Sequence, residues 1–321
     1  MQDPEQARAR TESAAQTIQA ISANLRRVIH APAETLDLCV LCLVAEGHLI
    51  LEDFPGVGKT MLAKALARSL NASFSRLQFT PDLLPSDVTG VNVFDQRSNS
   101  FEFKPGPVFA NLLLVDEINR ASPKTQAALL ECMQEQQVTV DGVSYELARP
   151  FMVMATQNPI EYEGTYPLPE AQLDRFTMRV SIGYPPLADE ARMLTEQTGE
   201  PPLETLEPVA DSTDALALAD AAKAVFVEES LNRYVVALLR ASRGDSRLYL
   251  GASPRAGIAL LRVAKARALA DGREYLLPDD VKAVAVPVLA HRLIVAPEAR
   301  SSGLTGTQVV ADVLEKTPVP V

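Results

Sequence analysis

The stretch Gly47–Ala67, GHLILEDFPGVGKTMLAKALA, decides the fold of this 321-residue chain. Its apolar run HLIL predicts a buried strand, the Pro-Gly turn ends that strand, and the residues from Lys59 onward predict a helix. A glycine-rich turn at the start of a helix presents backbone N–H groups that bind phosphate. The stretch therefore predicts an α/β domain that binds a nucleotide.

The turn itself matches most of a known phosphate-binding pattern. Gly56, Gly58, Lys59 and Thr60 fit the second half of G-x-x-x-x-G-K-[ST], in which lysine reaches the phosphate oxygens and the hydroxyl meets Mg²⁺. Asp53 stands where the pattern has its first glycine, so the match fails at one position. Taken alone, such a turn also arises by chance, and this alternative stays open for the loop by itself.

Composition narrows the class of protein. Hydrophobic residues make up 47% of the chain, which is ample for a buried core. The net charge of -11 argues against a generic nucleic-acid binder, whose surface is usually basic. The apolar run Cys39–Val44 is too short to span a bilayer and the N-terminus is polar, so we expect a cytoplasmic protein. Cys39 and Cys42 form a C-x-x-C without a second pair, and we interpret them as core residues rather than metal ligands.

A second group of chemical residues follows another apolar strand. The sequence NLLLVDEINR, Asn111–Arg120, ends its strand with two adjacent acids. Ligands of open α/β sheets bind at the carboxyl ends of the strands. We therefore expect Asp116 to hold Mg²⁺ and Glu117 to orient and polarise an attacking water. The alternative is an ordinary solvated strand end, which the upstream phosphate-binding turn makes less convincing.

Three further polar residues are candidates for contacts with the nucleotide. Asn158 follows the predicted strand Phe151–Thr156 and could contact the γ-phosphate, although Asn before Pro is also a common turn pair. Arg175 ends LPEAQLDRF and could neutralise charge in a neighbouring subunit's site, although most arginines are simply solvated. Arg255 falls in the first turn of a predicted helix, where the helix dipole disfavours a cation unless phosphate faces it, although it could also be a solvated arginine.

The remaining pattern is of two hairpins and a helical C-terminal part. Hairpins are predicted at Gly90–Pro107 and at Gln137–Leu147, which turns at Asp-Gly. Phe94, Phe101 and Tyr145 could grip a polypeptide there, but we favour the structural interpretation of one buried aromatic per hairpin face. Helices are predicted at the N-terminus, before the phosphate-binding strand, and in the C-terminal part over Ser212–Val227, Glu229–Ser242, Pro254–Asp271 and Pro278–Ala290. For the tail after Arg300 two alternatives stay open, partial disorder or a short helix at Thr307–Glu315.

In this order, PGVGKT, LLLVDEINRASPKTQAALLE, ATQNP, LPEAQLDRF and GASPRAG resemble the MoxR family of AAA+ ATPases, over residues 45 to 291. The resemblance implies an AAA+ P-loop core, a parallel sheet sandwiched by helices, with a C-terminal all-α lid domain. It places the core and its N-terminal helix at 1–187, with inserts at about 90–107 and 137–147. A connector at 188–210, the lid at 211–300 and a tail at 301–321 follow.

The resemblance also implies roles for individual residues. ATP would be bound by Walker A residues, and Mg²⁺ by Thr60 and Asp116. Glu117 would be the catalytic acid of Walker B, Asn158 sensor 1, Arg175 the arginine finger and Arg255 sensor 2. The Walker A residues are Pro55, Gly56, Val57, Gly58, Lys59, Thr60 and Met61. Ile29–Ala31 replaces the V-G-Q triplet common in the family, and Val28 and Ile29 are candidates for an adenine pocket or for plain core.

For function, the resemblance implies an ATP-hydrolysing chaperone that remodels or matures a client protein. It would work as a ring, a hexamer in the family, together with a von Willebrand factor A domain protein. Two other classes of function stay open. One is a nucleic-acid-stimulated motor of the helix-2-insert group, which the acidic chain disfavours. The other is a nucleotide-switched binding module without turnover, which the adjacent acids at 116 and 117 disfavour.

Overall fold

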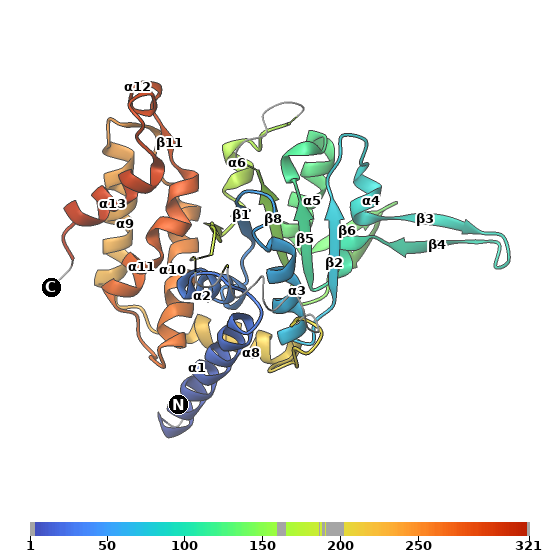
Figure 1. Ribbon diagram of the computed structural model, residues 1–321, viewed down its shortest axis with the longest axis horizontal. Helices are drawn as coiled ribbons and strands as arrows, with labels where there is room; N and C mark the ends of the chain where they lie inside the picture. Colours follow the sequence, from blue (N-terminus) through green and yellow to red (C-terminus); the bar gives the residue numbers. More distant parts are fainter. Residues whose placement is uncertain (1–3, 159–164, 186, 188–189, 191–201, 320–321) are drawn as a thin grey trace.

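The structure is a computed structural model that describes residues 4–158, 165–185, 187, 190 and 202–319 (Figure 1). At its centre is a five-stranded parallel sheet in the order β2-β5-β8-β1-β9. These strands are β1 Leu49–Glu52, β2 Phe74–Gln78, β5 Leu112–Asp116, β8 Met152–Gln157 and β9 Met178–Val180. Because all five run the same way, their carboxyl ends meet at one edge, as the sequence predicts for the candidate site.

Alternate strand residues enter two apolar cores on opposite faces of the sheet. Leu49 and Leu51 pack with α1 Pro4–Arg26, α2 Ala33–Val44 and α3 Lys59–Ser69. Ile50 points the other way, toward α4 Pro85–Thr89 and α5 Pro123–Glu135. Hydrophobic residues on both sides of each strand are what a parallel sheet covered by helices requires.

The first core contains two groups of residues whose role the sequence leaves open. Val28 and Ile29 are both buried in it just after α1 ends, the position expected of core residues. Cys39 and Cys42 are fully buried on α2, and burial raises the pKa of Cys39 to about 12. Both cysteines therefore pack as small apolar groups.

The predicted lid helices form, and most of them lie on the left of Figure 1. The same apolar core continues from α1 and α2 into this layer. Its helices are α8 Ser212–Ala224, α9 Glu229–Gly244, α10 Pro254–Ala270 and α11 Pro278–Leu289. The 3₁₀ turn η3 Ala290–Arg292, the strands β10 Leu248–Leu250 and β11 Ile294–Val295, and the helix α12 Pro297–Ser301 complete it. Of the predicted connector at 188–210, residues 188–189 and 191–201 lie outside the described residues.

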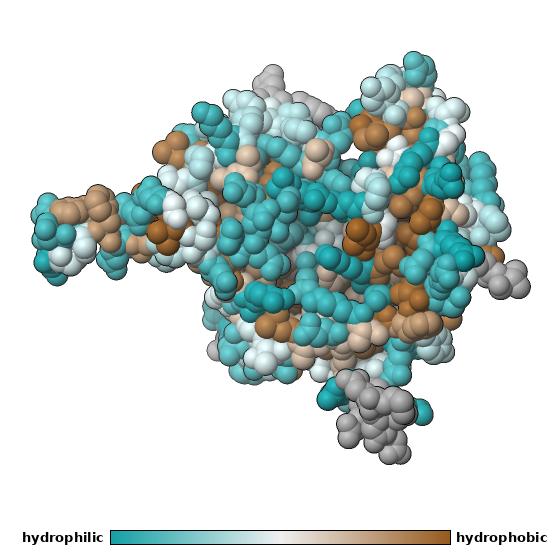
Figure 2. All heavy atoms as spheres, turned by 180° about the vertical axis from the view of Figure 1, so that it is seen from behind, coloured by the Kyte–Doolittle hydropathy of each residue, from teal (hydrophilic) through white to brown (hydrophobic). Residues whose placement is uncertain are grey.

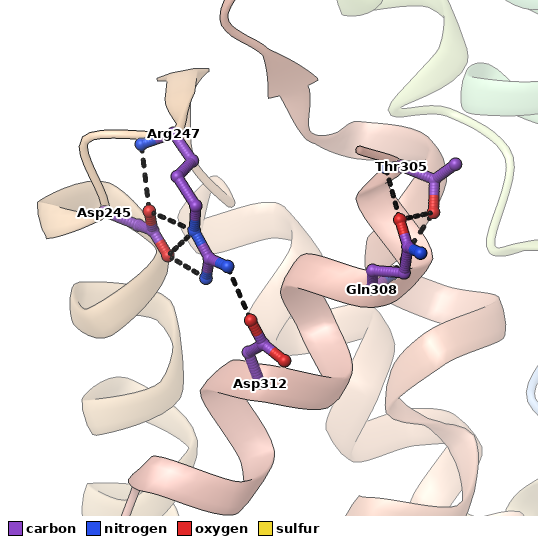
Figure 3. A network of polar contacts seen from close by, with 5 residues as sticks. All are labelled: Asp245, Arg247, Thr305, Gln308 and Asp312. Carbon is purple, nitrogen blue, oxygen red and sulfur yellow. Dashed lines mark hydrogen bonds and ion pairs between the residues drawn. The ribbon is translucent and has the colours of Figure 1, made fainter. Parts of the chain in front are cut away.

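The predicted last helix also forms, as α13 Gly306–Lys316, and packs on α9 and α11. Figure 3 shows how polar contacts fix it. Arg247 pairs with Asp245 at 2.7 Å and with Asp312 of α13 at 2.5 Å. Thr305 and Gln308 form a capping box at its N-terminus. The C-terminal helix is therefore built into the lid layer.

Both predicted hairpins form, and the longer one projects far from the body (Figure 1). It pairs β3 Gly90–Asp95 with β4 Ser100–Pro105, and the shorter one pairs β6 Gln137–Val140 with β7 Val143–Glu146. Near its tip Phe94 is 47% and Phe101 72% exposed. Their rings meet edge to face at 5.4 Å. The expectation that these aromatics are buried is wrong, because the arm has no body beneath it, and apolar side chains lie along it in Figure 2.

The base of the arm is joined to the shorter hairpin. Phe103 stacks on Tyr145 with ring centroids 4.1 Å apart. Asn92 donates a hydrogen bond to Asp141 at 2.7 Å. Tyr145 is half-buried, in keeping with the structural role expected for an aromatic on a hairpin face. One apolar and one polar contact thus connect two segments that are far apart in the sequence.

Candidate functional site

The phosphate-binding turn has the backbone that its glycines predict. Gly56 and Gly58 have φ of 87° and 89°, in the left-handed region that glycine adopts most easily, and α3 begins directly after Gly58. Apart from the adjoining residues of the chain, no described atom lies within 4 Å of the position that a Cβ would take at either glycine, which leaves open space above the turn. An anion can therefore approach the first N–H groups of α3.

Lys59 at the start of α3 is folded onto the turn. Its Nζ donates to the backbone oxygens of Asp53 at 2.6 Å and Phe54 at 3.1 Å. Burial lowers its pKa, and the carboxylates of Asp53, Asp116 and Glu117 oppose that change. Thr60 is half-buried beside it, and Met61 is exposed. The charge of Lys59 therefore lies at the turn, within reach of the acids of the sheet edge.

Asp53, which stands where the P-loop pattern has its first glycine, has a structural role that the pattern does not show. It is 4% exposed, and its carboxylate accepts hydrogen bonds from Ser181 Oγ at 2.7 Å, Ile182 N at 2.5 Å and Gly183 N at 3.0 Å. A buried carboxylate held by backbone N–H groups is strongly satisfied. A glycine could not make these bonds, so the departure from the pattern ties the turn to the segment after β9.

The two predicted acids lie at the carboxyl end of β5. In the sheet β5 is next to β8, and β8 is next to β1, the strand that leads into the P-loop, Pro55–Met61. Asp116 is buried and accepts from Thr156 Oγ at 3.3 Å and from Arg76 Nε at 2.7 Å. The same Thr156 hydroxyl accepts from the backbone N–H of Glu117 at 2.9 Å. Glu117 has a φ of 54°, an uncommon conformation that turns the chain sharply after the strand. One hydroxyl thus contacts the carboxylate of Asp116 and the backbone of Glu117.

Glu117 is also held by side chains that sequence reasoning missed. Gln78 Nε2 donates to its Oε2 at 2.9 Å, and Arg120 pairs with the same oxygen at 2.9 Å. Gln78 and Arg76 lie on β2, in register beside β5, with Gln78 opposite Asp116. Apolar and polar residues alternate in Phe74–Phe79, FSRLQF. This alternation contained the signal, because every second residue of a strand shares a face and both polar side chains end at the same sheet edge.

Asn158 lies at this edge too, directly after β8. It is half-buried and engaged in a contact of its own. β8 separates β5 from β1, so Asn158 is placed between the strand of the acids and the strand of the P-loop. The residues predicted from the P-loop, from β5 and from β8 are thus brought together at one edge.

The two predicted arginines lie elsewhere, in a cavity of about 220 Å³. Arg175 follows α6 Glu170–Leu173, and its Nη1 donates to the Leu130 carbonyl of α5 at 2.6 Å. Arg255 is exposed in the first turn of α10. In the described part of the chain both line this one cavity, whereas no residue of Pro55–Met61 does. The candidate residues therefore form two groups, one at the sheet edge and one between α6 and α10.

Comparison with known proteins agrees with this geometry. A profile described as "ATPase family associated with various cellular activities (AAA)" matches residues 48–178, and an AAA lid domain profile matches residues 240–313. The protein YeaC of Bacillus subtilis (strain 168) is 48% identical over 298 residues, which is 93% of each chain. The chaperone MoxR1 of Mycobacterium tuberculosis is 39% identical and aligns over 92% of this chain and 80% of its own length.

Solved structures agree as well. A crystal structure of a proposed ATPase from Cytophaga hutchinsonii superposes with a TM-score of 0.92 at 37% identity, covering 99% of both chains. No described helix is long and apolar enough to cross a membrane. With a parallel-sheet AAA core, a helical lid and relatives that align over most of their length, the chain belongs to the MoxR family of AAA+ ATPases.

Proposed function

We propose that the protein hydrolyses ATP at the sheet edge formed by the P-loop, Asp116, Glu117 and Asn158. The observation that supports this most is the placement of both acids beside an open, glycine-rich helix N-terminus. Pro55–Met61 would bind the phosphates, with Lys59 leaving the turn carbonyls to reach their oxygens. Asn158 would report on the γ-phosphate. Glu117 would polarise the attacking water.

The oxygen donors fit Mg²⁺. Thr60 supplies a hydroxyl at the start of α3 and Asp116 a carboxylate, the hard ligands that Mg²⁺ binds. The carboxylate has about four lone-pair sites, and its contacts with Arg76 and Thr156 use two of them. Bound Mg²⁺ would neutralise charge that develops on the phosphates. Thr60 and Asp116 are therefore proposed as its protein ligands.

The test of this site is a pair of substitutions. Lys59→Ala should abolish ATP binding, because it removes the cation that contacts the phosphates. Glu117→Gln should keep ATP bound while hydrolysis falls by several orders of magnitude. Glu102→Gln is the control, because it also removes one negative charge but lies on the exposed arm. This variant should hydrolyse ATP like the wild type. Wild-type turnover by Glu117→Gln would contradict the assignment.

We infer further that Arg175 and Arg255 act together on the site of a neighbouring subunit in a ring. They line one cavity that contains no P-loop residue, so they are placed to approach an anion brought by another chain. A guanidinium pair of this kind stabilises charge in phosphoryl transfer. A monomer should accordingly hydrolyse ATP poorly, and a hexameric ring is the expected working form.

Mixed rings test this assignment. Arg175→Ala and Glu117→Gln proteins, each inactive alone, should recover activity when mixed, because about a quarter of the sites then have both groups intact in a random ring. Arg255→Ala mixed with Glu117→Gln should recover as well. Arg175→Ala mixed with Arg255→Ala should not, since every site would face a defective neighbour. Recovery in this last mixture, or none in the first, would contradict joint action in trans.

We propose lastly that ATP turnover drives remodelling or maturation of a client protein, with a von Willebrand factor A domain partner. The relative MoxR1 is named a chaperone, and the exposed Phe94 and Phe101 on the arm offer an apolar contact. Deleting Phe94–Phe103 with a short Gly/Ser closure should leave basal turnover intact and remove partner stimulation. A pull-down with Glu117→Gln should hold a protein client, and recovery of nucleic acid alone would contradict the chaperone role.

A further inference from the structure

A third cation, almost fully buried, lines the cavity of the two arginines. The side chain of Arg292, in η3 of the lid, is 3% exposed, and its Nε pairs with Asp174 Oδ1 at 2.7 Å. Its Nη groups donate to the backbone oxygens of Thr177 at 3.0 Å and Phe176 at 2.6 Å. They also donate to the backbone oxygens of Asp174 at 3.3 Å and of Val288. A single guanidinium thus binds the residues on both sides of Arg175.

The other carboxylate oxygen of Asp174 reaches the second arginine's helix. Ser253 Oγ donates to Asp174 Oδ2 at 3.1 Å. Ser253 is also the N-cap of α10, since its Oγ accepts from Ala256 N at 3.1 Å. Arg255 lies in the turn that this cap begins. Asp174 is therefore bonded to the lid through both oxygens, once through η3 and once through the cap beside Arg255.

The arrangement links the two arginines without any contact between them. The backbone of Arg175 lies between Asp174 and Phe176, both of which are bound by Arg292. The start of α10 is bound to the same Asp174. The planar fork of arginine matches this set of acceptors in a way that the single ammonium of lysine cannot. Loss of any member should leave both guanidinium groups present but misplaced.

We propose that Asp174 and Arg292 are positioning residues that hold Arg175 and Arg255 as one unit facing the neighbouring subunit. This rests on the proposed action of those arginines in trans. It predicts that a variant fails to supply the two arginines to its neighbour's ATP site. The variant's own P-loop, Asp116 and Glu117 stay intact, so its own ATP site should work again when a normal neighbour supplies the arginines.

Two substitutions test the proposal. Asp174→Asn keeps the size and an acceptor for Ser253 but removes the charge, and Arg292→Lys keeps the charge but loses the fork. Each should lower kcat at least tenfold while the affinity for a fluorescent ADP analogue and the KM for ATP change less than twofold. Asp280→Asn is the matched control. Asp280 forms an equally buried lid ion pair with Arg273 at 2.6 Å, away from the cavity, and its loss should change kcat less than twofold.

The deciding experiment is to mix each variant with Glu117→Gln protein, beside the Arg175→Ala mixture. Recovery of activity to the level of the Arg175→Ala mixture is the expected result, and a purely structural defect of the lid would not give it. Wild-type kcat in both variants, or failure of their mixtures while the Arg175→Ala mixture recovers, would overturn the positioning role alone. If the Arg175→Ala mixture also fails, the proposed action in trans is wrong and this inference falls with it.

Discussion

The sheet edge and the arginine cavity are built in different ways. The P-loop needs only a strand, two glycines in the left-handed region and the start of a helix, all within Leu49–Ser69. The arginine cavity depends on partners 79 and 118 residues from Asp174 in the sequence. A local motif can thus set the chemistry of one half-site, whereas the position of the other half depends on how the lid packs.

Substitution of one cation from each half should separate binding from turnover. Lys59→Ala should abolish measurable ATP binding, because a charge-assisted contact with phosphate is lost. Arg175→Ala should leave affinity within twofold but lower turnover about 10³-fold, the effect of removing an arginine finger. Calorimetric titration and steady-state turnover of both variants measure this. Equal losses of affinity in the two variants would show that the halves are not distinct.

Acid should weaken the contacts of His48, which lines the arginine cavity just before β1. His48 accepts from Val153 N and contacts the Met133 carbonyl, and burial lowers its pKa to about 4. Its unfolded pKa of about 6.5 is higher, so the unfolded state binds more protons between these values. Stability present above pH 6.5 should therefore be lost as the pH falls toward 4, by about 3 kcal/mol.

Urea unfolding at a series of pH values measures this loss. Burial lowers the pKa of His291 too, so it adds a slope of the same sign. His48→Gln, which has no titrating group, should show a shallower slope between pH 6.5 and 5. The same slope in both proteins would show that His48 does not cause the loss of stability.

Restoring the consensus glycine should harm the sheet edge. Asp53→Gly recreates the formal P-loop pattern but leaves Ile182 N and Gly183 N without their acceptor, at a cost of about 2 kcal/mol in the free energy of unfolding. Asp53→Asn keeps one acceptor oxygen and should cost less. Chemical denaturation ranks the three proteins. A glycine variant as stable as the wild type would show that the hydrogen bonds of Asp53 to residues 181–183 do not stabilise the fold.

The smallest effect is expected on the arginine side. Ser253→Ala removes the N-cap of α10 and its bond to Asp174, and should lower the free energy of unfolding by about 1 kcal/mol. Turnover should fall a few-fold while ATP affinity stays unchanged. Ser253→Thr, which retains the hydroxyl, is the control. A loss of ATP affinity in Ser253→Ala would link the cap to the sheet edge instead.

The sequence predicts most of the fold because its strands and helices follow clear periodicities and caps. The P-loop and the acids at 116 and 117 could be located because their chemistry follows directly from adjacent residues. Three features could not be foreseen. The P-loop pattern shows only that Asp53 replaces a glycine, because its partners at 181–183 are distant in the sequence. Arg292 is one more basic residue in the sequence, and its role depends on how η3 packs under Phe176. The burial predicted for the aromatics of the arm is wrong, because a strand pattern does not show whether anything lies below the strand.

The joined hairpins have a mechanical consequence. The stacking of Phe103 on Tyr145 and the hydrogen bond from Asn92 to Asp141 join the two hairpins at the base of the arm, so that they move together. The six-residue strands of the arm span about 20 Å at about 3.3 Å per residue, so a tilt of about 10° at the root moves the tip by about 3.5 Å. A rotation of α5 and its neighbours can be too small to disturb their packing. The arm would still amplify it, and Phe94 and Phe101 near the tip would move by about the width of a side chain.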